Sequence, residues 1–81
     1  MKIIVRPFAG VKDICGFEER EITLPPGCTV EGAVDSLAAL FPGLTAARES
    51  LLYAVNEEYA DGGRTLVEND ILALFPPVSG G

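Results

Sequence analysis

Residues 75–81, with the sequence FPPVSGG, carry the clearest chemical signal in the chain. Pro76 and Pro77 cannot donate hydrogen bonds to a neighbouring strand, so we expect them to end a strand and keep the chain extended. Gly80 and Gly81 have no side chain, so residues 76–81 are predicted to form a thin, flexible arm. Such an arm can enter a channel too narrow for a Cβ atom, and it would present the carboxylate of Gly81.

A terminal carboxylate is a poor electrophile, because it is anionic and has a poor leaving group. An enzyme that spends ATP can convert it to an acyl-adenylate, which a sulfur or nitrogen nucleophile then attacks. In this hypothesis the chain is a carrier, and the catalytic groups lie on its partners. The sequence contains no histidine and shows no acid–base constellation, which agrees with a non-catalytic carrier.

The composition limits the remaining classes of function. The 81 residues correspond to one domain with a modest core, and 48% of them are hydrophobic, as in globular proteins. A net charge of −6 and scattered basic residues disfavour nucleic acids and anionic membranes as partners. The acidic surface suits a basic protein partner, although solubility alone also explains it. The sequence has no signal peptide pattern and no membrane span, so we expect a soluble cytoplasmic protein.

The two cysteines, Cys15 and Cys28, do not form a recognisable metal motif. Without histidine or a second cysteine pair, the usual zinc patterns are excluded, and no metal site is expected. In a cytoplasmic protein, both cysteines are expected to be free thiols. Lys12 lies near Cys15 in the sequence, which is a weak indication of an activated thiol.

Apolar periodicity predicts the elements that would position the arm. Strands are predicted at residues 2–8, 17–24, 53–56 and 71–75, with residues 57–60 as a possible extension of the third strand. A helix with Thr29 as its N-cap is predicted from an apolar stripe, formed by Val30, Ala33, Val34, Leu37 and Phe41. Residues 9–16 are predicted to be a turn, and residues 44–52 either a short helical turn or a loop. Asn69 is expected to adopt a left-handed conformation in a turn.

One helix cannot bury its stripe alone, so it must cover one face of a small sheet. We therefore predict an α+β domain at residues 1–75, followed by the arm. The last strand is apolar on both faces, and alternation places Phe8 and Phe75 on the face turned away from the helix, to which we also assign Tyr59. An exposed apolar patch of this kind usually marks an interaction site. Two alternatives are that residues 44–52 fold over this face, or that the face is simply apolar.

The chain resembles the MoaD-type small subunits of molybdopterin synthase, which belong to the ubiquitin-like MoaD/ThiS family of sulfur carriers. The resemblance covers the whole chain. It rests on FA at residues 8–9, AVN at residues 54–56, the turn at residues 66–70 and, above all, FPPVSGG at the end. It implies a β-grasp fold, in which a small mixed sheet carries one main helix on one face.

The resemblance also implies a function. A ubiquitin-activating-type enzyme would use ATP to adenylate Gly81, and sulfur from a donor protein would convert it to a thiocarboxylate. The arm, with Gly80 as a thin spacer, would then enter the large subunit and give its sulfur to cyclic pyranopterin monophosphate. The chain itself would bind no cofactor. The residues implied in partner binding are Phe8, Tyr59, Phe75, Pro76, Pro77, Val78 and Ser79.

Other readings use the same residues. Related carriers serve thiamine thiazole synthesis, tRNA thiolation or protein conjugation, and they differ only in the acceptor. The double proline favours molybdopterin synthesis, since carriers for thiamine often lack it. A plain interaction module without chemistry at Gly81 is a further alternative.

Overall fold

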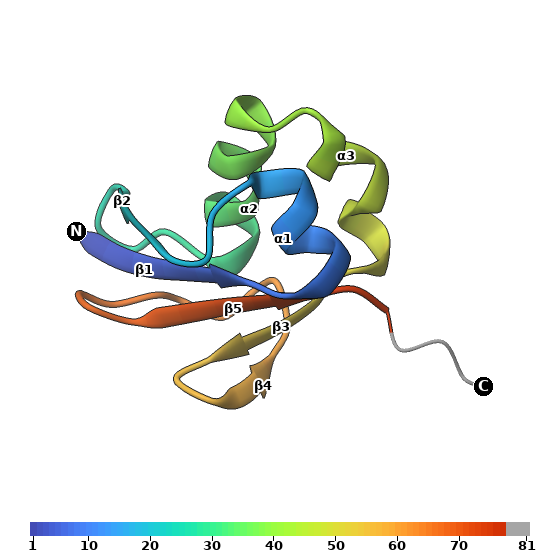
Figure 1. Ribbon diagram of the computed structural model, residues 1–81. Coiled ribbons are helices and arrows are strands. Elements are labelled where there is room, and N and C mark those ends of the chain that lie inside the picture. Colours follow the sequence, from blue (N-terminus) through green and yellow to red (C-terminus); the bar gives the residue numbers. More distant parts are fainter. Residues whose placement is uncertain (78–81) are drawn as a thin grey trace.

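A five-stranded mixed sheet with its helices on one face organises the chain (Figure 1). The computed structural model describes residues 1–77. Its elements, in chain order, are β1 (Lys2–Pro7), α1 (Ala9–Cys15), β2 (Arg20–Thr23), α2 (Val30–Leu40), α3 (Gly43–Ala47), the 3-10 turn η1 (Arg48–Ser50), β3 (Leu52–Val55), β4 (Glu58–Ala60) and β5 (Ile71–Phe75). The strand order is β2-β1-β5-β3-β4, with β1 and β5 parallel and the other pairs antiparallel. The predicted α+β class with a small mixed sheet is confirmed.

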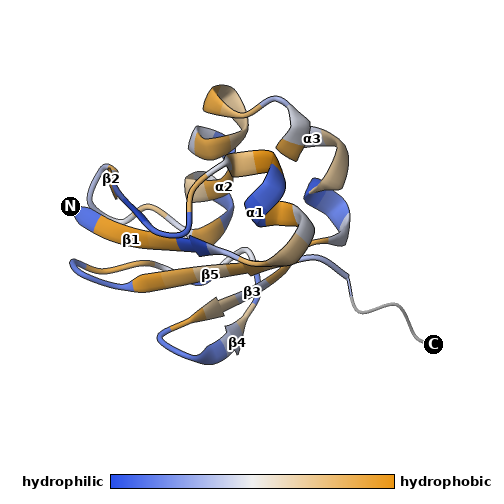
Figure 2. Ribbon diagram, viewed as in Figure 1, coloured by the Kyte–Doolittle hydropathy of each residue, from blue (hydrophilic) through white to orange (hydrophobic). Residues whose placement is uncertain are grey.

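The core lies between the helices and the two central strands. Figure 2 shows apolar residues along β1 and β5, beneath the helices. The side chains that meet there are Ile3 and Val5 of β1, Leu72 and Leu74 of β5, Val11 and Cys15 of α1, Val30, Ala33, Val34 and Leu37 of α2, and Leu44 of α3. The predicted stripe is therefore buried up to Leu37, whereas Phe41 is half-buried and follows the end of α2. The hydroxyl of Thr29 accepts a hydrogen bond from the Gly32 amide, as expected for an N-cap.

The structure corrects the prediction of a turn at residues 9–16, which contain α1. Val11 and Cys15 are four residues apart, so one short face of α1 enters the core. Two apolar anchors are too few to produce a recognisable helical period, which is why the sequence pattern failed here. The helix ends at Gly16, whose φ of 77° is a typical left-handed C-cap.

Residues 44–52 lie with the helices and do not cover the opposite face of the sheet. They contain most of α3, the turn η1 and the first residue of β3, and Leu44 is fully buried in the core. The alternative that this segment folds over the outer face is therefore wrong. The face of the sheet turned away from the helices is left open within the described part of the chain.

Residues 57–60 do not extend β3 but reverse onto it. Asn56 and Glu57 both have positive φ, of 50° and 70°, and β4 then pairs antiparallel with β3. Two successive positive φ values match a type I′ hairpin turn. Asn69, in the turn before β5, has the left-handed φ that was predicted, 69°.

A hydrogen-bond network ties this hairpin turn to the start of β5. The Asn56 amide nitrogen donates to the Asp70 carboxylate at 2.8 Å, and its oxygen accepts from the Ile71 amide at 2.9 Å. The second Asp70 oxygen accepts from the Val67 amide at 2.8 Å. Asp70 is only 6% exposed, and each of its two carboxylate oxygens accepts a hydrogen bond in the described structure.

The turn geometry predicts that Glu57→Gly raises the free energy of unfolding. A non-glycine residue in the left-handed region costs about 1–2 kcal/mol, partly offset by the greater backbone entropy of glycine, so we expect a gain of roughly 0.5–1 kcal/mol. Urea unfolding measures it. The matched control is Glu58→Gly in β4, which should lower stability, since glycine weakens a strand. A loss of stability in Glu57→Gly would contradict the assigned turn.

Candidate functional site

The outer face, meaning the side of the sheet turned away from the helices, has a hollow of about 310 Å³. Its lining comes from β1, β3, β4 and β5 and the segments next to them. The lining residues are Arg6, Phe8, Ala54, Glu57, Tyr59, Ile71, Ala73 and Phe75. We call this the outer-face hollow. It brings together Phe8, Tyr59 and Phe75, the three residues assigned to this face from the sequence.

Phe8 and Phe75 form a stacked aromatic pair at the end of the central strands. Their ring centroids are 4.7 Å apart and their planes differ by 8°. The Phe8 amide donates to the Leu74 carbonyl at 2.9 Å, so the chain stays beside β5 beyond the end of β1. The Phe8 side chain nevertheless remains 42% exposed. The pair is a preformed apolar contact surface directly before Pro76.

The predicted arm begins where β5 ends. Pro76 is half-buried, Pro77 is exposed, and neither belongs to a helix or strand, which agrees with their predicted role as strand terminators. The predictions for Val78, Ser79, Gly80 and Gly81 fall outside the described residues.

The free side of the hollow is formed by the edge strand β4. Tyr59 lies opposite Ala54 and is 80% exposed, which gives this face its most accessible aromatic ring. Leu52, which pairs with Phe75, is also exposed. Leu52 was not predicted from the sequence, because it lies in the ambiguous segment at residues 44–52. Alternation along β3 could have identified it, since Leu52 is two residues before Ala54 and therefore lies on the same face.

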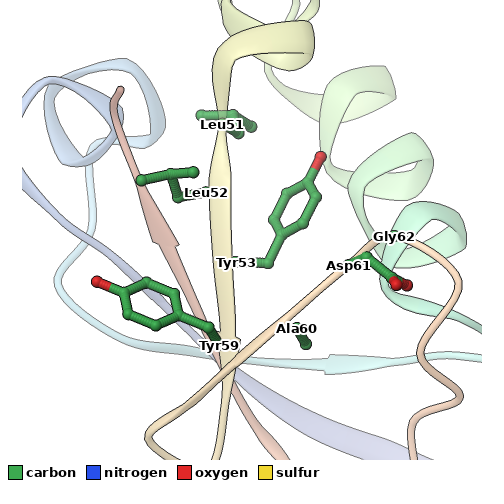
Figure 3. A pocket seen from close by; sticks show the side chains of 7 residues that line it. All are labelled: Leu51, Leu52, Tyr53, Tyr59, Ala60, Asp61 and Gly62. Carbon is green, nitrogen blue, oxygen red and sulfur yellow. The ribbon is translucent and has the colours of Figure 1, made fainter. Parts of the chain in front are cut away.

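A second hollow of about 570 Å³ lies around the edge strand β4 and the beginning of β3. In Figure 3, Leu52 and Tyr59 lie on one side of these strands and Tyr53 on the other, toward the helices. Among the described residues, Asp61 is the only carboxylate in its lining, and it accepts a hydrogen bond from the Gly63 amide at 2.8 Å. The residues around this hollow do not combine an acid, a base and a nucleophile.

The cysteines do not form a reactive centre with the side chains around them. Burial raises the pKa of the Cys15 thiol, which disfavours the thiolate. Lys12 does not activate it, because the ammonium group pairs with Glu18 at 2.9 Å and lowers the pKa of that carboxylate. Cys28 is also a free thiol and is half-buried. Within residues 1–77, no three potential metal ligands of the His, Cys, Asp or Glu type cluster together.

The helices of the described chain are all too short or too polar to span a membrane.

The outer face of the described structure is an apolar, aromatic contact surface with two charged residues, Arg6 and Glu57, at its margin. It fits protein binding next to Pro76 better than catalysis by its own side chains.

Comparison with known proteins gives relatives along the whole chain. The chain is 33% identical over 81 residues to the molybdopterin synthase sulfur carrier subunit of Arabidopsis thaliana, covering 100% of this chain and 84% of that protein. Among solved structures, it is similar to a protein described as molybdopterin converting factor, subunit 1, from Pyrococcus furiosus. That match has a TM-score of 0.86 and 26% identity, and covers 95% of this chain and 98% of the other.

Two further solved structures contain chains of similar fold. Small archaeal modifier protein 1 of Haloferax volcanii matches with a TM-score of 0.84 and 27% identity, covering 95% of this chain and 98% of the other. A complex of subunits 1 and 2 of molybdopterin-converting factor from Helicobacter pylori contains a chain of the same fold. There the TM-score is 0.71, the identity 23% and the coverage 100% of both chains.

The chain has a ubiquitin-like β-grasp fold, with a mixed sheet, a central parallel pair of strands and helices on one face. The solved structures named above share this fold. The model of the ThiS family matches residues 5–81, nearly the whole sequence. The chain therefore belongs to the ThiS family.

Proposed function

We propose that this chain is the sulfur carrier subunit of a molybdopterin synthase. The observation that carries the proposal is the position of the Phe8–Phe75 pair, directly before the segment PPVSGG. A partner that binds the outer face would receive residues 76–81 at a fixed starting point. The name and 33% identity of the Arabidopsis relative support the pathway.

The chemistry proceeds at Gly81 and is catalysed by partners. A ubiquitin-activating-type enzyme lets the Gly81 carboxylate attack the α-phosphate of ATP, and pyrophosphate leaves. A sulfide equivalent from a donor protein then displaces AMP and leaves a thiocarboxylate. On the large subunit, this sulfur passes to cyclic pyranopterin monophosphate, and hydrolysis returns Gly81 to a carboxylate.

The body of the domain contributes rigidity and recognition. β5 is paired on both sides, with β1 and with β3, so the strand that leads to Pro76 is held firmly. Aromatic residues in well-packed interface centres contribute a large share of binding energy, and Phe8, Tyr59 and Phe75 are suited to that role. The small side chain of Ser79 and the lack of side chains at Gly80 and Gly81 suit a narrow catalytic channel, and Val78 would be the apolar anchor at its entrance.

A second candidate is protein conjugation. The likeness to the Haloferax modifier favours it over the thiamine and tRNA alternatives. The activated Gly81 would be the same, but the acceptor would be a lysine amine and the product an isopeptide. The two functions differ in what is transferred to the acceptor: a sulfur atom in molybdopterin synthesis, and the whole chain in protein conjugation.

Intact-mass spectrometry tests the activation step. After incubation with the activating enzyme, ATP and the sulfur donor, the chain should gain the mass difference between sulfur and oxygen at Gly81. A cysteine persulfide would instead add a whole sulfur atom. The control Cys15→Ala/Cys28→Ala should gain the same mass as the unchanged chain, since the buried Cys15 and the half-buried Cys28 have no role in the proposal. Absence of the gain, or its loss in the control, would refute thiocarboxylation at Gly81.

Gly81→Ala should separate docking from chemistry. The added methyl group leaves the outer face unchanged, and that face is proposed to supply most of the binding energy, so Gly81→Ala should still bind the large subunit. Thiocarboxylate formation should fall strongly, because the methyl group crowds the channel of the activating enzyme. Normal formation in Gly81→Ala would argue against a channel that requires glycine.

Phe75→Asp tests the outer face as the docking surface. Because Phe75 is half-buried and points away from the core, we expect a stability loss of only about 1–2 kcal/mol from the lost stacking and strand propensity. Affinity for the large subunit should fall by about 2 kcal/mol or more, as at a hot spot. The control Leu40→Asp places the same charge at an exposed apolar residue of α2, on the helix side. Unfolding of Phe75→Asp, or equal affinity in both variants, would contradict the assignment.

A further inference from the structure

One row across the outer face combines two small residues between two large ones. Arg6 of β1 pairs with Ala73 of β5, and Ala73 pairs with Ala54 of β3. Ala54 in turn pairs with Tyr59 of β4. Neighbouring strands lie about 4.8 Å apart, so the Cα atoms of Arg6 and Tyr59 are separated by roughly 14 Å with only alanine methyl groups between them. The floor of the outer-face hollow is therefore a socket with room for one large side chain.

The wall at one side of this socket is a positioned cation. The Arg6 Nε donates to the Glu19 carboxylate at 2.6 Å, which fixes the guanidinium from the connection between α1 and β2. Within residues 1–77, no hydrogen bond uses the terminal nitrogens Nη1 and Nη2 of Arg6, although both can donate. Arg6 thus retains donors for a group that arrives from outside.

The charges around the socket are distributed unevenly. Arg6 and Glu57 are the two charged residues of the lining, and they come from different elements, β1 and the β3–β4 turn. A carboxylate that enters the hollow is repelled by Glu57 and by Glu19, which already pairs with Arg6, so its attraction to Arg6 depends on the terminal nitrogens that Glu19 does not use. The end of the hollow formed by Phe8 and Phe75 is apolar.

We propose that the socket between Arg6 and Tyr59 binds one bulky apolar side chain of the large subunit, with a neighbouring carboxylate of that subunit paired to Arg6. This inference rests on the proposed function, since it names the chemistry of the same partner. The apolar side chain is buried over the half-buried Ala73 and beside the already buried Ala54, and the carboxylate gains charge-assisted hydrogen bonds from the guanidinium. Glu19 acts as a positioning residue, and Arg6 determines which partners fit.

Filling the socket tests the apolar half. Ala73→Leu places a large side chain on its floor, and calorimetric titration with the purified large subunit should show affinity reduced about 30-fold or more, the loss typical of a hot spot. The matched control is Ala46→Leu, the same substitution at an exposed residue of α3 in the helix layer, which should bind like the unchanged chain. Thermal unfolding of each variant verifies the fold.

Exchanging the residues of the Arg6–Glu19 ion pair tests the proposed contact between Arg6 and a carboxylate of the large subunit. This test stays informative if Ala73→Leu fails to fold. The double variant Arg6→Glu/Glu19→Arg keeps the net charge and can keep the ion pair, yet it puts a carboxylate at the socket. We expect affinity to fall about tenfold or more, because like charges would face each other. The added loss should be greatest at low salt, whereas a purely structural effect would not depend on salt.

The outcomes separate this inference from the proposed function. Weak binding by Ala73→Leu and by the exchange variant, with normal binding by Ala46→Leu, supports the socket. Normal binding by the exchange variant overturns the proposed pairing of Arg6 with a carboxylate. Normal binding by Ala73→Leu overturns the proposed binding of an apolar side chain in the socket. In both cases a loss of binding in Phe8→Asp would leave the proposed function standing. If the unchanged chain does not bind the large subunit, the proposed function fails and the inference with it.

Discussion

The parallel pairing of β1 with β5 is the constraint on which the other features depend. The Ile4 amide donates to the Asp70 carbonyl at one end of the pair, and the Phe8 amide to the Leu74 carbonyl at the other, both at 2.9 Å. This register sends Val5 and Leu72 into the core and leaves Phe8 beside Phe75 on the outer face. A slip by one residue would exchange the two faces, because side chains alternate along a strand. The register thus sets both the stability of the domain and its contact surface.

The same pairing explains how a domain with so small a core can serve a chemical reaction. Its helices close one face of the sheet, so the other face and the end of β5 are available to partners. Under the proposed function, the domain needs neither a cleft nor an acid–base group. It needs a rigid strand, a recognisable face and an end that fits a narrow channel. The acidic surface, with a net charge of −6, adds long-range attraction to basic partners.

The sequence was informative where one element produces its own periodicity. The alternation of Ile71–Phe75 and the helical stripe of α2 predicted two elements, and alternation placed Phe8 and Phe75 on the outer face, whereas the outer position of Tyr59 depends on the unpredicted reversal into β4. The predictions failed at α1, with two core anchors, and at β4, where a hairpin turn uses Asn56 and Glu57 in place of the glycine that would have marked it. Arg6, Ala54 and the socket could not be predicted, because they depend on which strands become neighbours and in which register.

The most direct test of the account follows the sulfur itself. The chain would be prepared with an isotopically labelled sulfur in the Gly81 thiocarboxylate and mixed, for a single turnover, with the large subunit and cyclic pyranopterin monophosphate. The account predicts labelled sulfur in the dithiolene of molybdopterin and an intact chain with a Gly81 carboxylate. Unlabelled product, or label retained on the chain while molybdopterin accumulates, would contradict it.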